Sequence, residues 1–166
     1  MNEINKNLLN QLYDKYKDLP LLISEKRCWT FAEFFNEACL LSDSLCTDPQ
    51  NRIGLCSENY EFLLLAMMAI WMREGIVVPL NPKFPPEQKE ELLRKVKCDV
   101  TLSENYTHTN SKRKITRKMP LLNPDAWSTI IFTSGSSGFP KAVIHSLANH
   151  FFSALGANRI MPLKPR

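Results

Sequence analysis

The chain has 166 residues and a mass of 19.1 kDa, which fits one domain that buries about 70% of its unfolded surface. Hydrophobic residues make up 44% and charged residues 23%, a balance typical of a soluble globular protein. The net charge of +4 is modest and local, because five of the 21 basic residues crowd together without interleaved aromatic residues: Lys112, Arg113, Lys114, Arg117 and Lys118. This pattern favours a solvated loop over a nucleic-acid interface.

The cysteines and the amino terminus point to a cytoplasmic location. Five cysteines are widely spaced, form no C-x-x-C pair and have no histidine at metal-ligand spacing. We therefore predict reduced, buried thiols and no metal site. The first ten residues lack the basic region and apolar run of a signal peptide. No apolar run reaches the roughly 20 residues that a membrane span needs.

The first third of the chain predicts two helices separated by a small hairpin. Apolar residues recur at helical spacing over 5–17, and residues 21–23 can pair with 27–29. Thr30 is a candidate N-cap, and Glu33, three residues later, would complete a capping box. The helix after this cap is expected from Phe31 to about Cys46.

The middle of the chain alternates short strands with helices. Strands are expected at 52–57, 76–82 and 99–103. Asn59 should open a helix whose segment 62–72 has no polar side chain, so we expect it to be buried on most sides, with Gly75 ending it. A charged helix should run from the prolines at 85 and 86 to about Lys97.

The last third contains the feature around which the rest is organised. Residues 104–126 have little periodicity and are expected to form a mobile surface loop. Ser128 to Phe132 should be a strand buried on both faces, and Ser146 should cap a helix from Leu147 to about Ala157. The alternation predicts an α/β fold, with layered helices on a mainly parallel sheet.

A polar segment, T-S-G-S-S-G-F-P-K, leaves that strand at residues 133–141. Its hydroxyls, its two glycines and its lysine suit an anion, because glycine lets backbone amides approach a ligand and lysine supplies a mobile charge. A plain surface turn is the alternative. The segment is not a P-loop, because Pro140 stands where the second glycine would be, and it is not a nucleophile elbow, because Phe139 follows Ser137 by two residues.

The same nine residues resemble the phosphate-binding signature of the acyl-adenylate-forming superfamily, [ST]-[ST]-G-[ST]-[ST]-G-x-P-K, at every defined position. The chain departs from the family at Ala142, where glycine is usual. Two further segments are similar to family patterns: W-T-F-A-E-F at 29–34 and G-I-V-V-P-L-N-P at 75–82. The resemblance implies that residues 1–166 are the N-terminal portion of the large AMP-binding domain. It also implies that the rest of that chain is a partner of this part.

The family joins a carboxylate to ATP, releases pyrophosphate and often passes the acyl group to coenzyme A. By resemblance, the phosphates would be held by Thr133, Ser134, Gly135, Ser136, Ser137, Gly138 and Lys141, with Mg²⁺ bridging phosphate oxygens. The implied partners are a small carboxylate, ATP and coenzyme A. No catalytic residue, metal ligand, covalent intermediate or nucleic acid is expected in this portion, which alone should not turn over.

The segment after Lys141 resembles the o-succinylbenzoate-CoA ligases of menaquinone biosynthesis. The match is carried by Ala142, His145, Ser146, His150, Ser153, Ala154 and Gly156. His145 and His150 are either close to substrate or a packed pair at the start of a helix. Three alternatives stay open: another aryl or fatty acyl-CoA ligase, a stand-alone nucleotide- or anion-binding module, and a nucleic-acid binder acting through residues 112–118.

Overall fold

The computed structural model describes residues 13–45, 48–98, 100–105, 122–134 and 140–162. Seven strands and four helices are assigned within these residues. The strands are β1 (Pro20–Ile23), β2 (Cys28–Thr30), β3 (Arg52–Leu55), β4 (Ile76–Pro79), β5 (Val100–Leu102), β6 (Trp127–Thr133) and β7 (Lys141–Ser146). The helices are α2 (Phe31–Ser44), α3 (Tyr60–Trp71), α4 (Pro86–Lys95) and α5 (Leu147–Ile160).

The main sheet has five strands in the order β5-β3-β4-β6-β7. The first four are parallel to one another, which confirms the predicted mainly parallel sheet. The exception is β7, which returns antiparallel to β6 and was not predicted. It was missed because Lys141 to Ser146 lacks the uninterrupted apolar run that marks a strand buried on both faces.

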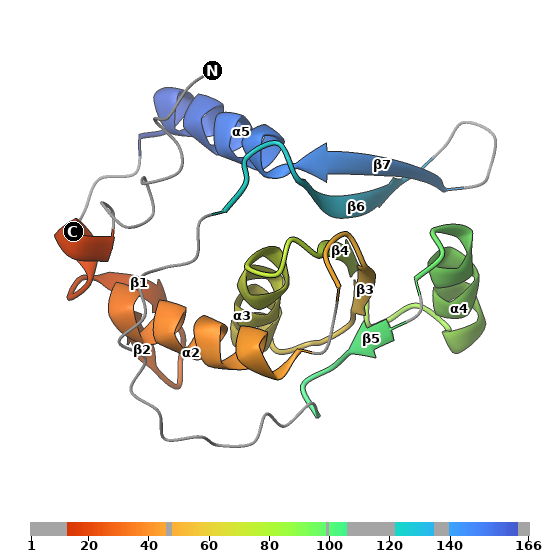
Figure 1. Cartoon of the computed structure of the whole chain (residues 1–166), viewed down its shortest axis with the longest axis horizontal. Coiled ribbons are helices and arrows are strands. Elements are labelled where there is room, and N and C mark those ends of the chain that lie inside the picture. The colour runs from red at the N-terminus through yellow and green to blue at the C-terminus, as the bar shows by residue number, and fades with distance from the viewer. Residues whose placement is uncertain (1–12, 46–47, 99, 106–121, 135–139, 163–166) are drawn as a thin grey trace.

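Helices cover both faces of this sheet, with α2 and α3 on one side and α4 on the other (Figure 1). Alternate residues of each strand serve the two layers. Ile53, Leu55 and Val77 pack toward α2 and α3, whereas Ile76 and Val78 join Leu92 and Val96 at the end of α4. This is the layered α/β architecture that the alternation of elements predicts.

The helix starts predicted at Thr30 and Asn59 are confirmed. The Thr30 hydroxyl accepts from the Glu33 amide while the Glu33 carboxylate accepts from the Thr30 amide, and Asn59 caps α3. The end of α3 differs from expectation. Glu74 takes the left-handed conformation with φ of 54°, and the Gly75 amide donates to the Ile70 carbonyl at 2.9 Å. The pattern is a Schellman cap with glutamate in place of glycine.

The expectation that segment 62–72 of α3 is buried on most sides is confirmed, because Leu64 is its one exposed residue. Two other predictions need correction. Only Ser128 to Ile130 of β6 is buried on both faces, since Ile131 is 38% exposed. None of the four described cysteines is fully buried, and none is in a disulfide. Most of the helix expected at 5–17 and of the loop expected at 104–126 lies outside the described residues, although residues 13–16 are helical.

The β1–β2 hairpin is tied to α3 through Glu61. The Glu61 carboxylate accepts a hydrogen bond from the Trp29 indole at 3.1 Å and another from the Ser24 hydroxyl. These hydrogen bonds, from Ser24 first and Trp29 second, lower the pKa of Glu61 below its ordinary 4.5. The hairpin and the first turn of α3 therefore share one charged contact.

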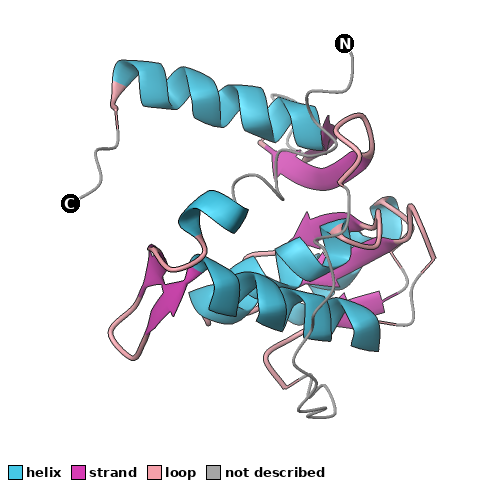
Figure 2. Ribbon diagram, turned by 60° about the vertical axis from the view of Figure 1, so that its left-hand side comes forward, coloured by secondary structure: helices cyan, strands magenta, loops and turns pink. Residues whose placement is uncertain are grey.

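The helix α5 contrasts with the other helices. None of its residues is buried, and Phe151, Phe152 and Ile160 are 47%, 55% and 84% exposed. Figure 2 shows it running along the outside of the fold. Its start is nevertheless well defined, because Ser146 and Asn149 form a capping box.

Candidate phosphate-binding site

The predicted anion-binding segment connects β6 to β7 at the carboxyl end of β6. Thr133, the last residue of β6, is the register partner of Lys141, the first of β7, and the Thr133 hydroxyl lies 3.4 Å from the Lys141 carbonyl. The hairpin thus brings the two ends of the segment together. Ligands of open α/β folds bind at the carboxyl edge of the sheet, and the segment leaves β6 at that edge.

Three of the predicted phosphate-binding residues are described, and all three are exposed: Thr133, Ser134 and Lys141. Gly135, Ser136, Ser137 and Gly138 lie outside the described residues. The described part offers two hydroxyl donors and one mobile cation at the mouth of a hairpin. This combination can bind phosphate oxygens, because cation-assisted hydrogen bonds are stronger than neutral ones.

A second lysine reaches the segment from another element. Lys95, at the end of α4, donates a hydrogen bond from its ammonium to the Pro140 carbonyl, one residue before Lys141. The contact joins residues 45 positions apart in the sequence. Sequence reasoning missed it, because a lysine in the last turn of a charged helix is explained well enough by the helix dipole.

The root of the hairpin is fixed by buried polar groups. Ser128 and Thr129 are each 1% exposed, and the pairing of β6 with β7 shifts register between Trp127 and Thr129. The Ser128 hydroxyl donates to the His145 carbonyl at 3.0 Å, and the Trp71 indole donates to the Ser128 carbonyl at 2.8 Å. Trp71 was expected to be a core residue, so its polar role is new.

The two histidines pack against each other and against Trp71. The His150 ring centroid is 5.6 Å from that of His145 and 5.6 Å from that of Trp71. His150 Nε2 shares a hydrogen bond of 2.9 Å with the Thr129 hydroxyl. Burial, and then the neighbouring His145, lower the pKa of His150 below its ordinary 6.5. The packed pair foreseen as one of two possibilities is therefore present. A contact with substrate is not tested.

Metal-binding groups do not cluster in the described part of the chain. No three histidine, cysteine, aspartate or glutamate side chains there come together in a way that could hold an ion. Beside Thr133 and Lys141, the donor set consists of hydroxyls and an ammonium, which suits phosphate better than a cation. Any Mg²⁺ at this segment would therefore be held largely by the phosphates of a nucleotide, as is common for this ion.

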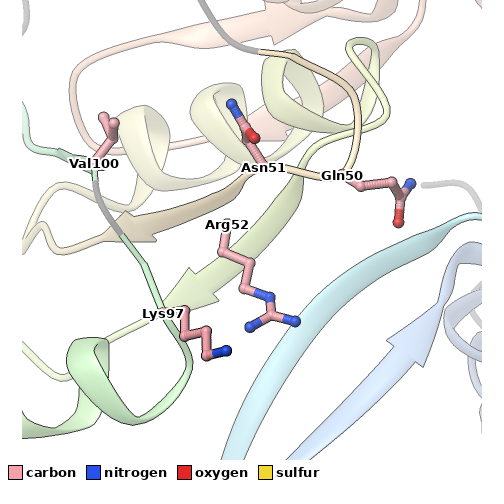
Figure 3. Close-up of a pocket in the computed structure, with 5 residues that line it drawn as sticks. All are labelled: Gln50, Asn51, Arg52, Lys97 and Val100. Atoms are coloured by element: carbon pink, nitrogen blue, oxygen red, sulfur yellow. The ribbon is translucent and has the colours of Figure 1, made fainter.

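A separate pocket of about 280 Å³ lies at the amino ends of β3 and β5, lined by Gln50, Asn51, Arg52, Lys97 and Val100 (Figure 3). Its cations complete the end of α4. Arg52 donates to the Val96 carbonyl at 2.6 Å, and Lys97 is the left-handed residue of a second Schellman cap. We therefore interpret the pocket as the space beside the C-terminal end of α4.

Two remaining predictions concern charge and membranes. The basic cluster at 112–118 lies outside the described residues, so its role is not tested. No helix within the described residues is both long and apolar enough to cross a bilayer.

Comparison with known proteins gives a family match that is independent of the phosphate-binding segment. The sequence pattern of the family described as AMP-binding enzyme matches residues 10–121, more than half of the chain. That range ends before Thr133. It and the nine-residue signature are therefore separate pieces of evidence.

Similar proteins include a peptide synthetase and two solved structures that share the fold. Nonribosomal peptide synthetase 8 of Aspergillus fumigatus is 25% identical over 82% of this chain, which spans 2% of that protein. The o-succinylbenzoate coenzyme A synthetase of Bacillus subtilis, in complex with ATP and magnesium ion, superposes with a TM-score of 0.80 at 21% identity, over 96% of this chain and 48% of that one. The Klebsiella oxytoca NpsA N-terminal subdomain, bound to 3-hydroxyanthranilyl-AMSN, gives 0.74 at 22%, over 86% and 40%.

Proposed function

Because this chain belongs to the AMP-binding enzyme family, we propose that its β6–β7 segment binds the phosphates of MgATP and that the whole protein adenylates a carboxylate. The observation that carries the proposal is the pairing of Thr133 with Lys141 at the carboxyl end of β6, which closes a segment of hydroxyls and glycines into a loop. The chain spans less than half of the similar solved structures. The activity of the whole protein is therefore part of the proposal.

The chemistry required of this segment is charge neutralisation. A carboxylate attacking the α-phosphorus and a departing pyrophosphate are both anions, so fixed donors and cations near the phosphates lower the barrier. Lys141 would contribute the point charge, Thr133 and Ser134 would contribute hydroxyl donors, and the amides around Gly135 and Gly138 would contribute further donors. None of these groups would form a covalent bond to the substrate.

We propose o-succinylbenzoate as the carboxylate and coenzyme A as the final acyl acceptor. The support is the similarity of the segment from Ala142 to Gly156 to ligases of that substrate, together with the shared fold. Under this proposal His145 and His150 lie at the substrate side of the hairpin. We place the reaction in the cytoplasm, because none of the described cysteines forms a disulfide.

Adenylation of an amino acid for peptide synthesis is the second candidate. Its support is the similarity in sequence to nonribosomal peptide synthetase 8 of Aspergillus fumigatus, at 25% identity. The two candidates share the phosphate-binding segment and differ in the acid that they activate.

Exchange of radioactive pyrophosphate into ATP, measured with the natural protein that carries residues 1–166, separates the two candidates. Under the first candidate o-succinylbenzoate supports exchange, and under the second an amino acid does. Binding of MgATP without exchange for any acid would instead favour a stand-alone nucleotide-binding module.

The phosphate-binding role is tested by Lys141→Met, which keeps the apolar stem and removes the charge. Loss of one charge-assisted hydrogen bond of about 1.5–3 kcal/mol should weaken MgATP binding roughly 10- to 150-fold. Calorimetric titration of the natural protein that carries residues 1–166 measures this change. Lys26→Met, in the exposed β1–β2 turn, is the matched control, because it makes the same change in net charge. Equal affinities for the two variants would refute the assignment.

A further inference from the structure

The root of the loop-bearing hairpin contains a β-bulge. Trp127 pairs with Ser146 and Thr129 pairs with His145, so Ser128 is the extra residue of β6. Bulges increase the local twist of a strand pair and bend the bulged strand. The direction in which β6 and β7 extend toward Thr133 and Lys141 is therefore set at Ser128.

Groups from three other elements hold this bulge. Trp71 of α3 donates to the Ser128 carbonyl, and the Ser128 hydroxyl donates to the His145 carbonyl of β7. His150 of α5 shares a hydrogen bond with Thr129 at 2.9 Å while its ring packs on Trp71. The first residues of α5 also donate backbone hydrogen bonds to the Pro124 and Ala126 carbonyls just before β6, and among the contacts described His150 supplies a side-chain hydrogen bond from α5 to β6.

We propose that His150 is a positioning residue: by its hydrogen bond to Thr129 and its packing on Trp71, it fixes the bulged start of β6 and thereby aims the β6–β7 hairpin at the phosphates. The proposal rests on the proposed phosphate-binding function of that hairpin. It assigns His150 a role through Thr129 and requires no contact between His150 and substrate.

The protonation of His150 gives this role a pH dependence. The groups packed on the imidazole are the His145 ring from β7 and the uncharged side chains of Trp71 from α3 and Thr129 from β6. Burial and His145 lower the pKa of His150 below 6.5, so the neutral ring is the form that the fold favours. The stability that the neutral ring contributes is therefore present above pH 6.5 and is lost as the pH falls through the lowered value.

Two substitutions separate the hydrogen bond from the packing. His150→Phe keeps an aromatic ring against Trp71 and removes the bond, whereas His150→Gln places an amide where Nε2 lies and can restore it. Thr129→Val removes the same bond from the other side with little change in volume. We expect MgATP binding to weaken about 2- to 10-fold in His150→Phe and Thr129→Val, as for loss of one neutral hydrogen bond, and to recover in His150→Gln.

Hydrogen exchange supplies a readout that does not need nucleotide. Amides of residues 129–133 and 141–145 should exchange faster in His150→Phe than in His150→Gln. The Phe and Val changes combined should be no worse than either alone, because they remove one bond. The ratio of MgATP affinity at pH 7.5 to that at pH 5.5 should be larger for the unaltered chain than for His150→Gln, in which the titrating ring is gone.

The outcomes distinguish this proposal from the one on which it rests. If Lys141→Met weakens MgATP binding but His150→Phe leaves both binding and hairpin exchange unchanged, the phosphate site stands and the positioning role is overturned. If the unaltered natural protein does not bind MgATP, the proposed phosphate-binding function is wrong. Amide hydrogen exchange alone then decides whether His150 holds the hairpin. Faster exchange in both His150→Phe and His150→Gln would also overturn the proposal, because it would show packing and not the hydrogen bond to be responsible.

Discussion

Two glycines of this chain offer a matched test of the packing, because the same change should act in opposite directions. Gly54 is buried in the middle of β3, beneath α4. A Cβ added there would lie 2.8 Å from Leu93 Cδ2 and 3.0 Å from Thr101 Oγ1, both closer than ordinary contact. Gly156 lies in the interior of α5, and an added Cβ would meet nothing within 4 Å.

The expected free energies depend on these distances. Overpacking by one methyl group costs about 1–3 kcal/mol, and the reduced freedom of the unfolded chain returns about 0.4–1 kcal/mol, so Gly54→Ala should destabilise by about 1–2 kcal/mol. At Gly156 only the favourable effect operates, and alanine should stabilise α5 by about 0.5–1 kcal/mol. The two variants should therefore differ by about 1.5–3 kcal/mol.

Urea denaturation followed by circular dichroism measures both free energies of unfolding. A further variant identifies the cause: Leu93→Ala removes the methyl group nearest to the new Cβ, so it should cost less in the Gly54→Ala background than alone. If Gly54→Ala proved as stable as Gly156→Ala, the close packing of α4 on β3 would be incorrect.

Two further predictions concern the β1–β2 hairpin and the helix beside it. Glu61→Gln should make the free energy of unfolding less dependent on acid pH. The folded-state pKa of Glu61 lies below 4.5, so its contribution to stability is present above pH 4.5 and is lost as the pH falls through the lowered value. The free energies of unfolding measured with urea at pH 6 and pH 3.5 should therefore differ less for the variant than for the unaltered chain. Thr30→Ala removes one arm of the capping box of α2 and should destabilise by about 1 kcal/mol in the same assay, whereas Thr30→Ser, which keeps the hydroxyl, should cost far less.

Features that depend on neighbours in sequence could be predicted from the residues alone. Thr30 with Glu33, and Ser146 before α5, are caps whose partners lie three residues away, so their geometry is local. The alternation of short apolar runs with amphipathic ones predicted a mainly parallel sheet. It did not predict the antiparallel strand β7. The segment at 133–141 was singled out by its composition and by its resemblance to a phosphate-binding signature, and its role in binding phosphate stays a prediction.

Features that depend on distant residues needed the structure. Ile130 and Ile131 are adjacent, chemically identical residues, yet one is 4% and the other 38% exposed, because successive side chains of a strand point to opposite faces and only Ile130 joins the cluster with Leu92 and Val96 at α4. The antiparallel return of β7 was hidden for a similar reason. A strand exposed along most of its length has no apolar pattern to mark it.

The sequence by itself determined that this chain forms capped helices and buried strands, and it predicted an anion-binding segment after one of them. Only the tertiary structure decided that Lys95 reaches Pro140, that Trp71 donates to Ser128, and that His150 meets Thr129 from 21 residues away. The physical reason is range. Periodicity and capping are set by contacts within a few residues, whereas the direction of the hairpin is set by polar groups that become neighbours only once the sheet and its helices have packed.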